Sequence, residues 1–210
     1  MKSILYVALA VCSFASQIDA LLPPDQALQR LIEGNTRYTK DQFVSPDRTQ
    51  ERRSELVSTQ TPFAVIVGCS DSRVTPEIIF DQGIGDLFVV RVAGNVVAPV
   101  ELDSVEYAVG VLGASFVLVL GHENCGAVKA VLNDQTKDIE ALANLIEPAI
   151  AKAKDAPGDP LENAVKANAK SVADYLKSTT LLRKKIQGGT VQVKAGYYNL
   201  KSGKVDILPE

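Results

Sequence analysis

The sequence contains one histidine, three cysteines and no tryptophan in 210 residues. A single histidine excludes any mechanism that needs two histidines within one chain. Three cysteines are too few to staple a small secreted domain with disulfides. Basic residues do not exceed acidic ones, 22 against 25, so the charge pattern of a nucleic-acid-binding protein is missing and we expect no nucleic acid as a partner. With 46% hydrophobic residues and a net charge of −3, the chain is too apolar for disorder, and its length suits one globular domain.

Long apolar runs are also missing, except at the N-terminus. Lys2 supplies a positive charge, residues 4–15 are almost entirely apolar, and Ile18 and Ala20 fit the −3 and −1 positions of a signal-peptidase site. This pattern predicts a secretory signal peptide over residues 1–20, its cleavage, and export to a periplasm or beyond. The run is too short to cross a bilayer core of about 30 Å, so we expect no membrane contact after cleavage.

Two alternatives for this segment remain open. It could form a short buried helix, or a lipid anchor could be attached at Cys12, although Val11 is larger than the residue that usually precedes a lipidated cysteine. If the segment is removed, Cys69 and Cys125 are the only cysteines left. An exported protein with two cysteines must pair them or occupy them, for example with a metal. Residues 21–210 are then a single domain, with an N-terminal helical arm over 23–60.

Short apolar runs alternate with helical patterns along this domain. Residues 63–68 and 116–120 are apolar throughout, and residues 87–92 are apolar except for Arg91, as in strands that are buried on both faces. Helical spacing covers 25–38, 101–112, 127–132, 137–154 and 161–186, and two strand-like runs follow at 190–199 and 204–208. The alternation predicts an α/β fold with a mostly parallel central sheet, flanking helices and an antiparallel edge strand or hairpin.

All the cysteine and histidine of the domain lies directly after two of these predicted strands. Cys69 follows the first strand, and His122 and Cys125 follow the third. Because ligands bind at the carboxyl ends of parallel strands, we expect these side chains to meet in one crevice. Two thiolates and one imidazole are a typical catalytic zinc set, which leaves a fourth position for water and lowers its pKa towards neutrality. Spacing alone leaves thiol chemistry, a Cys69–Cys125 disulfide and inert packing open as alternatives.

Asp71 and Arg73 follow Cys69 closely enough to pair with each other inside the crevice. A carboxylate held by a guanidinium stays ionised and oriented, and it can accept a hydrogen bond from a metal-bound hydroxyl. The alternative is an ordinary surface ion pair, which would contribute little.

Two motifs resemble the β class of carbonic anhydrases, and bacterial members in particular: Cys69-Ser70-Asp71-Ser72-Arg73-Val74, and the run from Gly121 to Val128. The resemblance continues in residues 27–35, 88–95 and 104–108 and covers nearly the whole predicted mature chain. It implies a zinc lyase that interconverts carbon dioxide and bicarbonate by attack of zinc-bound hydroxide, with Zn²⁺ held by Cys69, His122 and Cys125. It also implies that Asp71 orients the hydroxide and Arg73 holds Asp71.

The same resemblance implies substrate-binding roles for four further residues: Gln60, Phe88, Tyr107 and Gly126. Gln60 would reach the substrate across a dimer interface, and Phe88 and Tyr107 would line an apolar carbon dioxide pocket. The expected assembly is a homodimer or a dimer of dimers, with the N-terminal helix packed on the partner subunit.

Two further expectations accompany the resemblance. If Arg73 is drawn away, Asp71 would close the site as a fourth zinc ligand. Some bacterial members have an inhibitory bicarbonate pocket built around a tryptophan, but Ile66 occupies that position here, so we expect no such pocket. Competing hypotheses are an enzyme that acts on carbonyl sulfide or carbon disulfide, an exported zinc-binding protein without catalysis, and a thiol–disulfide protein.

Overall fold

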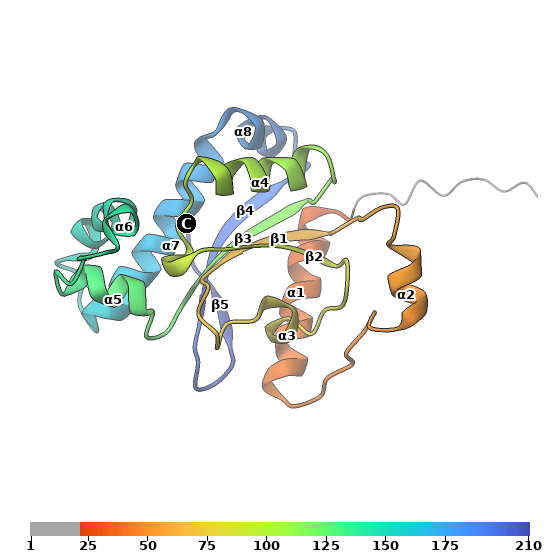
Figure 1. Ribbon diagram of the computed structural model, residues 1–210, viewed down its shortest axis with the longest axis horizontal. Helices are drawn as coiled ribbons and strands as arrows, with labels where there is room; N and C mark the ends of the chain where they lie inside the picture. Colours follow the sequence, from red (N-terminus) through yellow and green to blue (C-terminus); the bar gives the residue numbers. More distant parts are fainter. Residues whose placement is uncertain (1–21) are drawn as a thin grey trace, which may run out of the picture.

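A computed structural model describes residues 22–210 (Figure 1). The predicted signal peptide over 1–20, and Cys12 within it, lie outside the described residues. In the part of the chain that is described, no helix has the length and apolar character needed to cross a membrane.

A five-stranded sheet forms the centre of the molecule, in the order β2-β1-β3-β4-β5. The strands are β1 (Ala64–Gly68), β2 (Leu87–Arg91), β3 (Phe116–His122), β4 (Gln192–Tyr198) and β5 (Val205–Ile207). The first four are parallel, and β5 pairs antiparallel with β4 at the edge. The predicted α/β fold with its antiparallel edge strand is therefore confirmed.

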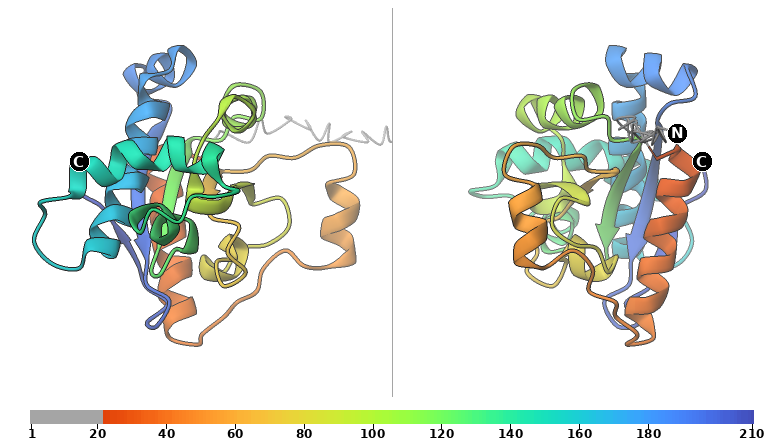
Figure 2. Two further views of the ribbon diagram at one scale, coloured as in Figure 1. Left: turned by 60° about the vertical axis from the view of Figure 1, so that its left-hand side comes forward. Right: turned by 90° about the vertical axis from the view of Figure 1, so that its right-hand side faces the viewer.

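Both faces of the sheet are covered by helices, which explains why β1 and β3 are apolar and buried along their whole length. One face packs against α4 (Pro99–Gly110), α7 (Pro160–Ser178) and α8 (Thr180–Gln187). The other face packs against α1 (Pro24–Thr39) and α3 (Pro76–Ile79). Figure 2 shows these two layers on opposite sides of the strands. Beyond the carboxyl ends of the strands lie the 3-10 turn η1 (Ala93–Asn95) and the helices α5 (Gly126–Leu132) and α6 (Glu140–Ala153).

The single helix predicted over 161–186 is wrong, because two helices cover these residues. Thr179 has an extended backbone, with φ −68° and ψ 154°, and separates α7 from α8. The break lets Leu182 of α8 turn back into the core beside Leu176, whereas a straight helix would carry it away from the sheet.

The N-terminal helix α1 packs on the sheet of its own chain, and its contact with a partner subunit stays a prediction. Ala27 and Leu31 of α1 are buried against the sheet of the same chain. Asn35 donates from Nδ2 to the carbonyls of Ile79 and Gly203, at 3.1 and 2.8 Å. Asn35 is 5% exposed, and its two hydrogen bonds tie α1 to α3 and to the β4–β5 turn. The amphipathic pattern of α1 alone did not reveal this connection.

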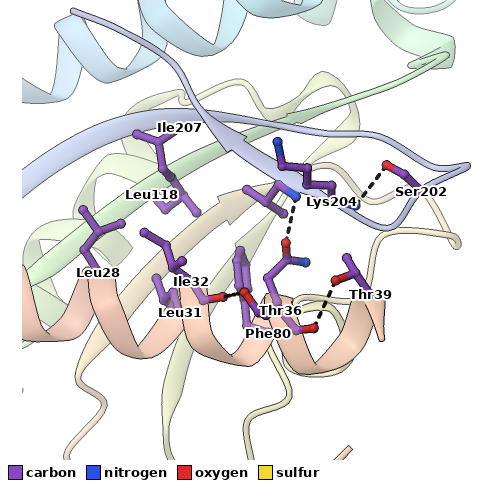
Figure 3. A pocket seen from close by; sticks show the side chains of 12 residues that line it. Leu28, Leu31, Ile32, Thr36, Thr39, Phe80, Leu118, Ser202, Lys204 and Ile207 are labelled. Atoms are coloured by element: carbon purple, nitrogen blue, oxygen red, sulfur yellow. Dashed lines mark hydrogen bonds between the residues drawn. The ribbon is translucent and has the colours of Figure 1, made fainter. Parts of the chain in front are cut away.

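A pocket of about 300 Å³ lies between α1 and the β4–β5 hairpin (Figure 3). Its walls are mostly apolar, with Leu28, Ile32 and Ile207 among the lining residues, and Lys204 and Thr36 add polar groups. None of the predicted site residues lines it.

The rest of the predicted arm extends away from the sheet (Figures 1 and 2). It contains one short helix, α2 (Gln50–Glu55), none of whose residues is buried. Within the predicted arm over 23–60, α1 therefore packs on the sheet and α2 is exposed.

Candidate metal centre

The three predicted ligands come together at the point where the chain order of the sheet reverses. From β1 the chain continues to β2 on one side, and it then crosses to β3 on the other. Cys69 follows β1, His122 ends β3, and Cys125 directly precedes α5. A crevice forms at such a switch point because the loops after the two strands leave in opposite directions.

Their ligand atoms all lie within 4.8 Å of one another. The side chains of Cys69, His122 and Cys125 are 4%, 0% and 0% exposed, and the two cysteines are free. The Nδ1 atom of His122 lies 2.9 Å from the Glu123 carbonyl, while its Nε2 has no hydrogen-bond partner among residues 22–210. Because a carbonyl can only accept, Nδ1 carries the proton and Nε2 offers its lone pair to the site.

The two thiols share a hydrogen bond, and this separates their acidities. The hydrogen bond from Cys125 lowers the pKa of Cys69, and bonds from the backbone N–H groups of Asp71 and Gly94 act in the same direction. The same shared bond, together with burial, raises the pKa of Cys125. A bound cation requires its coordinating thiols to be deprotonated. Because one thiol of this buried pair is already acidic, the pair can accept a cation readily.

Asp71 lies beside this group and is fixed by Arg73. Arg73 donates from Nε to Oδ1 at 2.9 Å and from Nη2 to Oδ2 at 2.7 Å, which is a bidentate pair. These bonds hold the pKa of the Asp71 carboxyl well below its usual range. Its Oδ2 lies 3.9 Å from His122 Nε2, so the carboxylate faces the ligand group while it remains bonded to Arg73.

Arg91 holds the loop that carries Cys69 and Asp71. From the last position of β2, it donates to the Cys69 carbonyl at 2.9 Å and to the Asp71 carbonyl at 2.7 Å. The sequence motifs gave this arginine no role. The sequence signal for this role is the position of Arg91. It ends an otherwise apolar strand, at the same level as the loop that follows the neighbouring strand.

The donor set suits a zinc ion. Two buried thiols and one imidazole nitrogen without a partner leave a tetrahedral ion one open position, as in catalytic zinc sites. Structural zinc sites need a fourth protein ligand, and the nearby carboxylate is already bonded to Arg73.

The predicted substrate-binding residues are brought together only in part. The rings of Phe88 and Tyr107 lie 6.4 Å apart, and Gly126 is the first residue of α5, next to Cys125. Gln60 is exposed and lines a separate hollow with Tyr107 and Leu87. Among residues 22–210, no hydrogen bond joins Gln60 to the ligand group of its own chain.

Comparisons with known proteins agree with this site. A family model described as carbonic anhydrase matches residues 64–205, which contain all three ligands. The carbonic anhydrase of Mycolicibacterium smegmatis is 36% identical over 192 residues, covering 88% of this chain and 93% of that protein. Carbonic anhydrase 2 of Mycobacterium tuberculosis is 37% identical over 188 residues, covering 86% and 91%.

A solved structure repeats the fold as well. The β-carbonic anhydrase CafA of the fungal pathogen Aspergillus fumigatus is 26% identical, covers 88% of this chain and 89% of its own, and superimposes with a TM-score of 0.67. Sequence, fold and donor set therefore agree, and the chain belongs to the β-carbonic anhydrase family.

Proposed function

We propose that this protein catalyses the zinc-dependent, reversible hydration of carbon dioxide to bicarbonate and a proton. The observation that carries the proposal is the buried Cys69, His122 and Cys125 group, with the ionised Asp71 held beside it by Arg73. A protein that only stored zinc would need the three ligands but not the oriented carboxylate.

When bound, zinc supplies Lewis acidity, which makes water acidic enough to serve as a nucleophile near neutral pH. Asp71 Oδ2 accepts a hydrogen bond from the attacking hydroxide and so directs the oxygen lone pair at carbon dioxide. The carboxylate can only accept, because its low pKa keeps it ionised across the neutral range. The pair with Arg73 supports an open site at rest, in which Asp71 is not a fourth ligand.

Phe88 and Tyr107 are proposed to form the apolar wall that receives carbon dioxide. The backbone N–H of Gly126 is proposed to donate to a substrate oxygen. As the first residue of α5, Gly126 has an amide that the helix itself does not use.

The test is a stopped-flow carbon dioxide hydration assay on purified protein, before and after removal of metal with a chelator. We expect hydration at alkaline pH that is lost on chelation and restored by zinc. Cys69→Ser should lose bound zinc and activity together, whereas Ser70→Ala, an exposed neighbour, should retain both. Bound zinc without chelator-sensitive hydration would refute the enzymatic proposal.

We further propose that two copies of the chain associate through the arm. α2 has six residues and none is buried, and a helix this short is not stable alone in water. Val57 and Val111, close to the hollow that contains Gln60 and Tyr107, are 85% and 69% exposed. A second copy that covers these side chains would bring its Gln60 towards the first copy's substrate pocket.

Sedimentation of Val57→Asp and of the matched variant Val100→Asp, at another strongly exposed valine outside the hollow, tests the homodimer. The first variant should shift the mass towards that of one chain, and the second should keep the parent's mass. A parent that sediments as a monomer at micromolar concentration would contradict the proposal.

Residues 1–20 are proposed to be a signal peptide, with a mature domain from Leu21 and a periplasmic or secreted location. Expression of the full chain in a bacterial host should give exported protein whose N-terminal sequence begins at Leu21. Uncleaved protein retained in the cytoplasm would overturn this.

A further inference from the structure

A buried asparagine in the middle of α7 has no role in the proposed reaction, and its side chain is only partly hydrogen-bonded. Asn168 is 0% exposed and lies between buried Val165 and Ala169. Its Nδ2 donates to the Gly94 carbonyl at 2.7 Å. Its Oδ1 has no hydrogen-bond partner among residues 22–210. An unpaired buried amide oxygen costs about 1–3 kcal/mol of folding free energy. An apolar residue would therefore give a more stable protein at this position, unless the bond to Gly94 has a function.

Gly94 links this asparagine to the metal ligands. While its carbonyl accepts from Asn168, its N–H donates to the sulfur of Cys69 at 3.3 Å. One residue therefore connects α7, which carries no ligand, with the first ligand of the site.

The turn that contains Gly94 is packed closely against its neighbours. Gly94 has φ 72°, and the next residue, Asn95, has φ 46°, so two consecutive residues adopt the left-handed region. A Cβ at Gly94 would lie 2.9 Å from Ile146 Cδ1 and 3.3 Å from Ala127 Cβ. Glycine and asparagine both tolerate this region, so it is the close fit of Gly94 and the bond from Asn168 that fix where its N–H points.

We propose that Asn168 is a positioning residue for the Cys69 thiolate. By holding the Gly94 carbonyl, it keeps the Gly94 N–H directed at the sulfur. That hydrogen bond withdraws electron density from the sulfur and so limits the charge that Cys69 donates to a bound metal. The inference depends on the metal site of the proposed function, but it does not depend on the substrate.

The experiment uses Asn168→Leu, which removes the unpaired Oδ1 but also leaves the Gly94 carbonyl without its donor, so we expect a folded variant of roughly parent stability or slightly below it. With cobalt in place of zinc, the thiolate-to-metal charge-transfer band should move to longer wavelength, because a sulfur without its hydrogen bond is oxidised more easily. The dissociation constant of the metal, measured by chelator competition, should rise roughly tenfold, because losing the fixed position of the Cys69 sulfur outweighs its stronger donation, as is usual when a partner that orients a metal ligand is lost.

Leu176→Ala is the matched control, since it weakens the same helix in the core without touching the turn. It should lower the melting temperature and leave the band and the dissociation constant unchanged. In protein loaded with cadmium-113, coupling of the Gly94 amide proton to the metal through the sulfur reports the hydrogen bond directly. This coupling should be present in the parent and lost in Asn168→Leu.

Three results would overturn the proposal. These are parent-like spectra and affinity in folded Asn168→Leu, equal shifts in Leu176→Ala, or a failure of Asn168→Leu and of a second variant without the amide, Asn168→Ala, to fold while Leu176→Ala folds. Because the readout is metal binding, a parent that shows thiolate–cobalt bands but hydrates no carbon dioxide would refute the proposed function and leave the role of Asn168 standing.

Discussion

At the scale of single residues, different side chains of the candidate metal centre supply the donor atoms and the oriented negative charge. Cys69, His122 and Cys125 provide buried donor atoms, and Asp71 provides a fixed negative charge beside them. The side chain of Arg73 is 52% exposed, so its contribution lies in the geometry of Asp71 rather than in folding energy.

Replacing Asp71 by alanine should therefore slow the reaction without releasing the metal. We expect kcat to fall by about 10² or more, because the hydroxide loses its oriented hydrogen-bond acceptor. Zinc content should stay near that of the parent, since the carboxylate is bonded to Arg73 and not needed as a ligand. Stopped-flow hydration and metal analysis measure the two quantities, and Ser72→Ala is the exposed neighbouring control. Loss of zinc in Asp71→Ala would show that Asp71 is a ligand at rest.

At the scale of elements, α1 and the start of the arm are anchored by a buried carboxylate. Asp81 accepts from Arg37 Nε at 2.6 Å, from the Val44 N–H at 3.0 Å and from the Ser45 N–H at 2.9 Å. Burial raises the pKa of Asp81, but these three hydrogen bonds outweigh it, so the pKa lies below its ordinary value.

Asp81→Asn should destabilise the protein by roughly 2 kcal/mol at pH 7, the usual cost of removing a charged hydrogen-bond partner. Because the folded pKa is depressed, the stability that Asp81 contributes is complete above the unfolded pKa of about 4 and is lost as pH falls through the folded value. The gap between parent and variant, measured by urea unfolding, should narrow below about pH 4. Asparagine tolerates the left-handed backbone at this position, and the exposed, left-handed Asp41→Asn is the control. A gap that is independent of pH would contradict this assignment.

The contact between α1 and the C-terminal end of α3 leaves no room for a side chain at Gly34. A Cβ at Gly34 would lie 1.8 Å from the Phe80 carbonyl oxygen, which belongs to the backbone and cannot rotate away. Gly34→Ala should cost about 3 kcal/mol, as overpacking does, despite the better helix propensity of alanine. In Gly110→Ala the nearest atom, Leu181 Cδ1, lies 3.5 Å away, so thermal unfolding should show no loss of stability. Equal melting temperatures for the two variants would refute this close packing.

At the scale of the whole molecule, the single histidine has a kinetic consequence. It is 0% exposed inside the ligand group, so it is not free to carry the proton that each hydration releases. Carboxylates, tyrosines, water or buffer must do so, although imidazole is the side chain best suited near pH 7. We expect kcat to rise with buffer concentration at constant ionic strength, while kcat/KM stays constant. Stopped-flow hydration over a buffer series measures both, and a kcat independent of buffer would reveal a shuttle within the protein.

The sequence by itself determined which side chains meet at the site and the class of fold, and the resemblance favoured zinc over the other chemistries that the spacing left open. Residue types decide which atoms can bind a metal, and the alternation of apolar runs with helical spacing decides that strands and helices form layers. Both properties are local, so Cys69, His122, Cys125 and the Asp71–Arg73 pair could be predicted from residue type and spacing. Resemblance, rather than spacing, supplied Gln60, Phe88 and Tyr107.

Only the tertiary structure decided which elements meet. The docking of α1 on its own sheet depends on one buried asparagine, Asn35, and on the missing side chain of Gly34, and neither shows in an amphipathic pattern. The break at Thr179 follows from the packing of Leu182 rather than from a helix-breaking residue. The bond from Asn168 to Gly94 joins residues 74 positions apart. Such contacts arise when distant segments are packed into one core, and packing is a property of the whole chain.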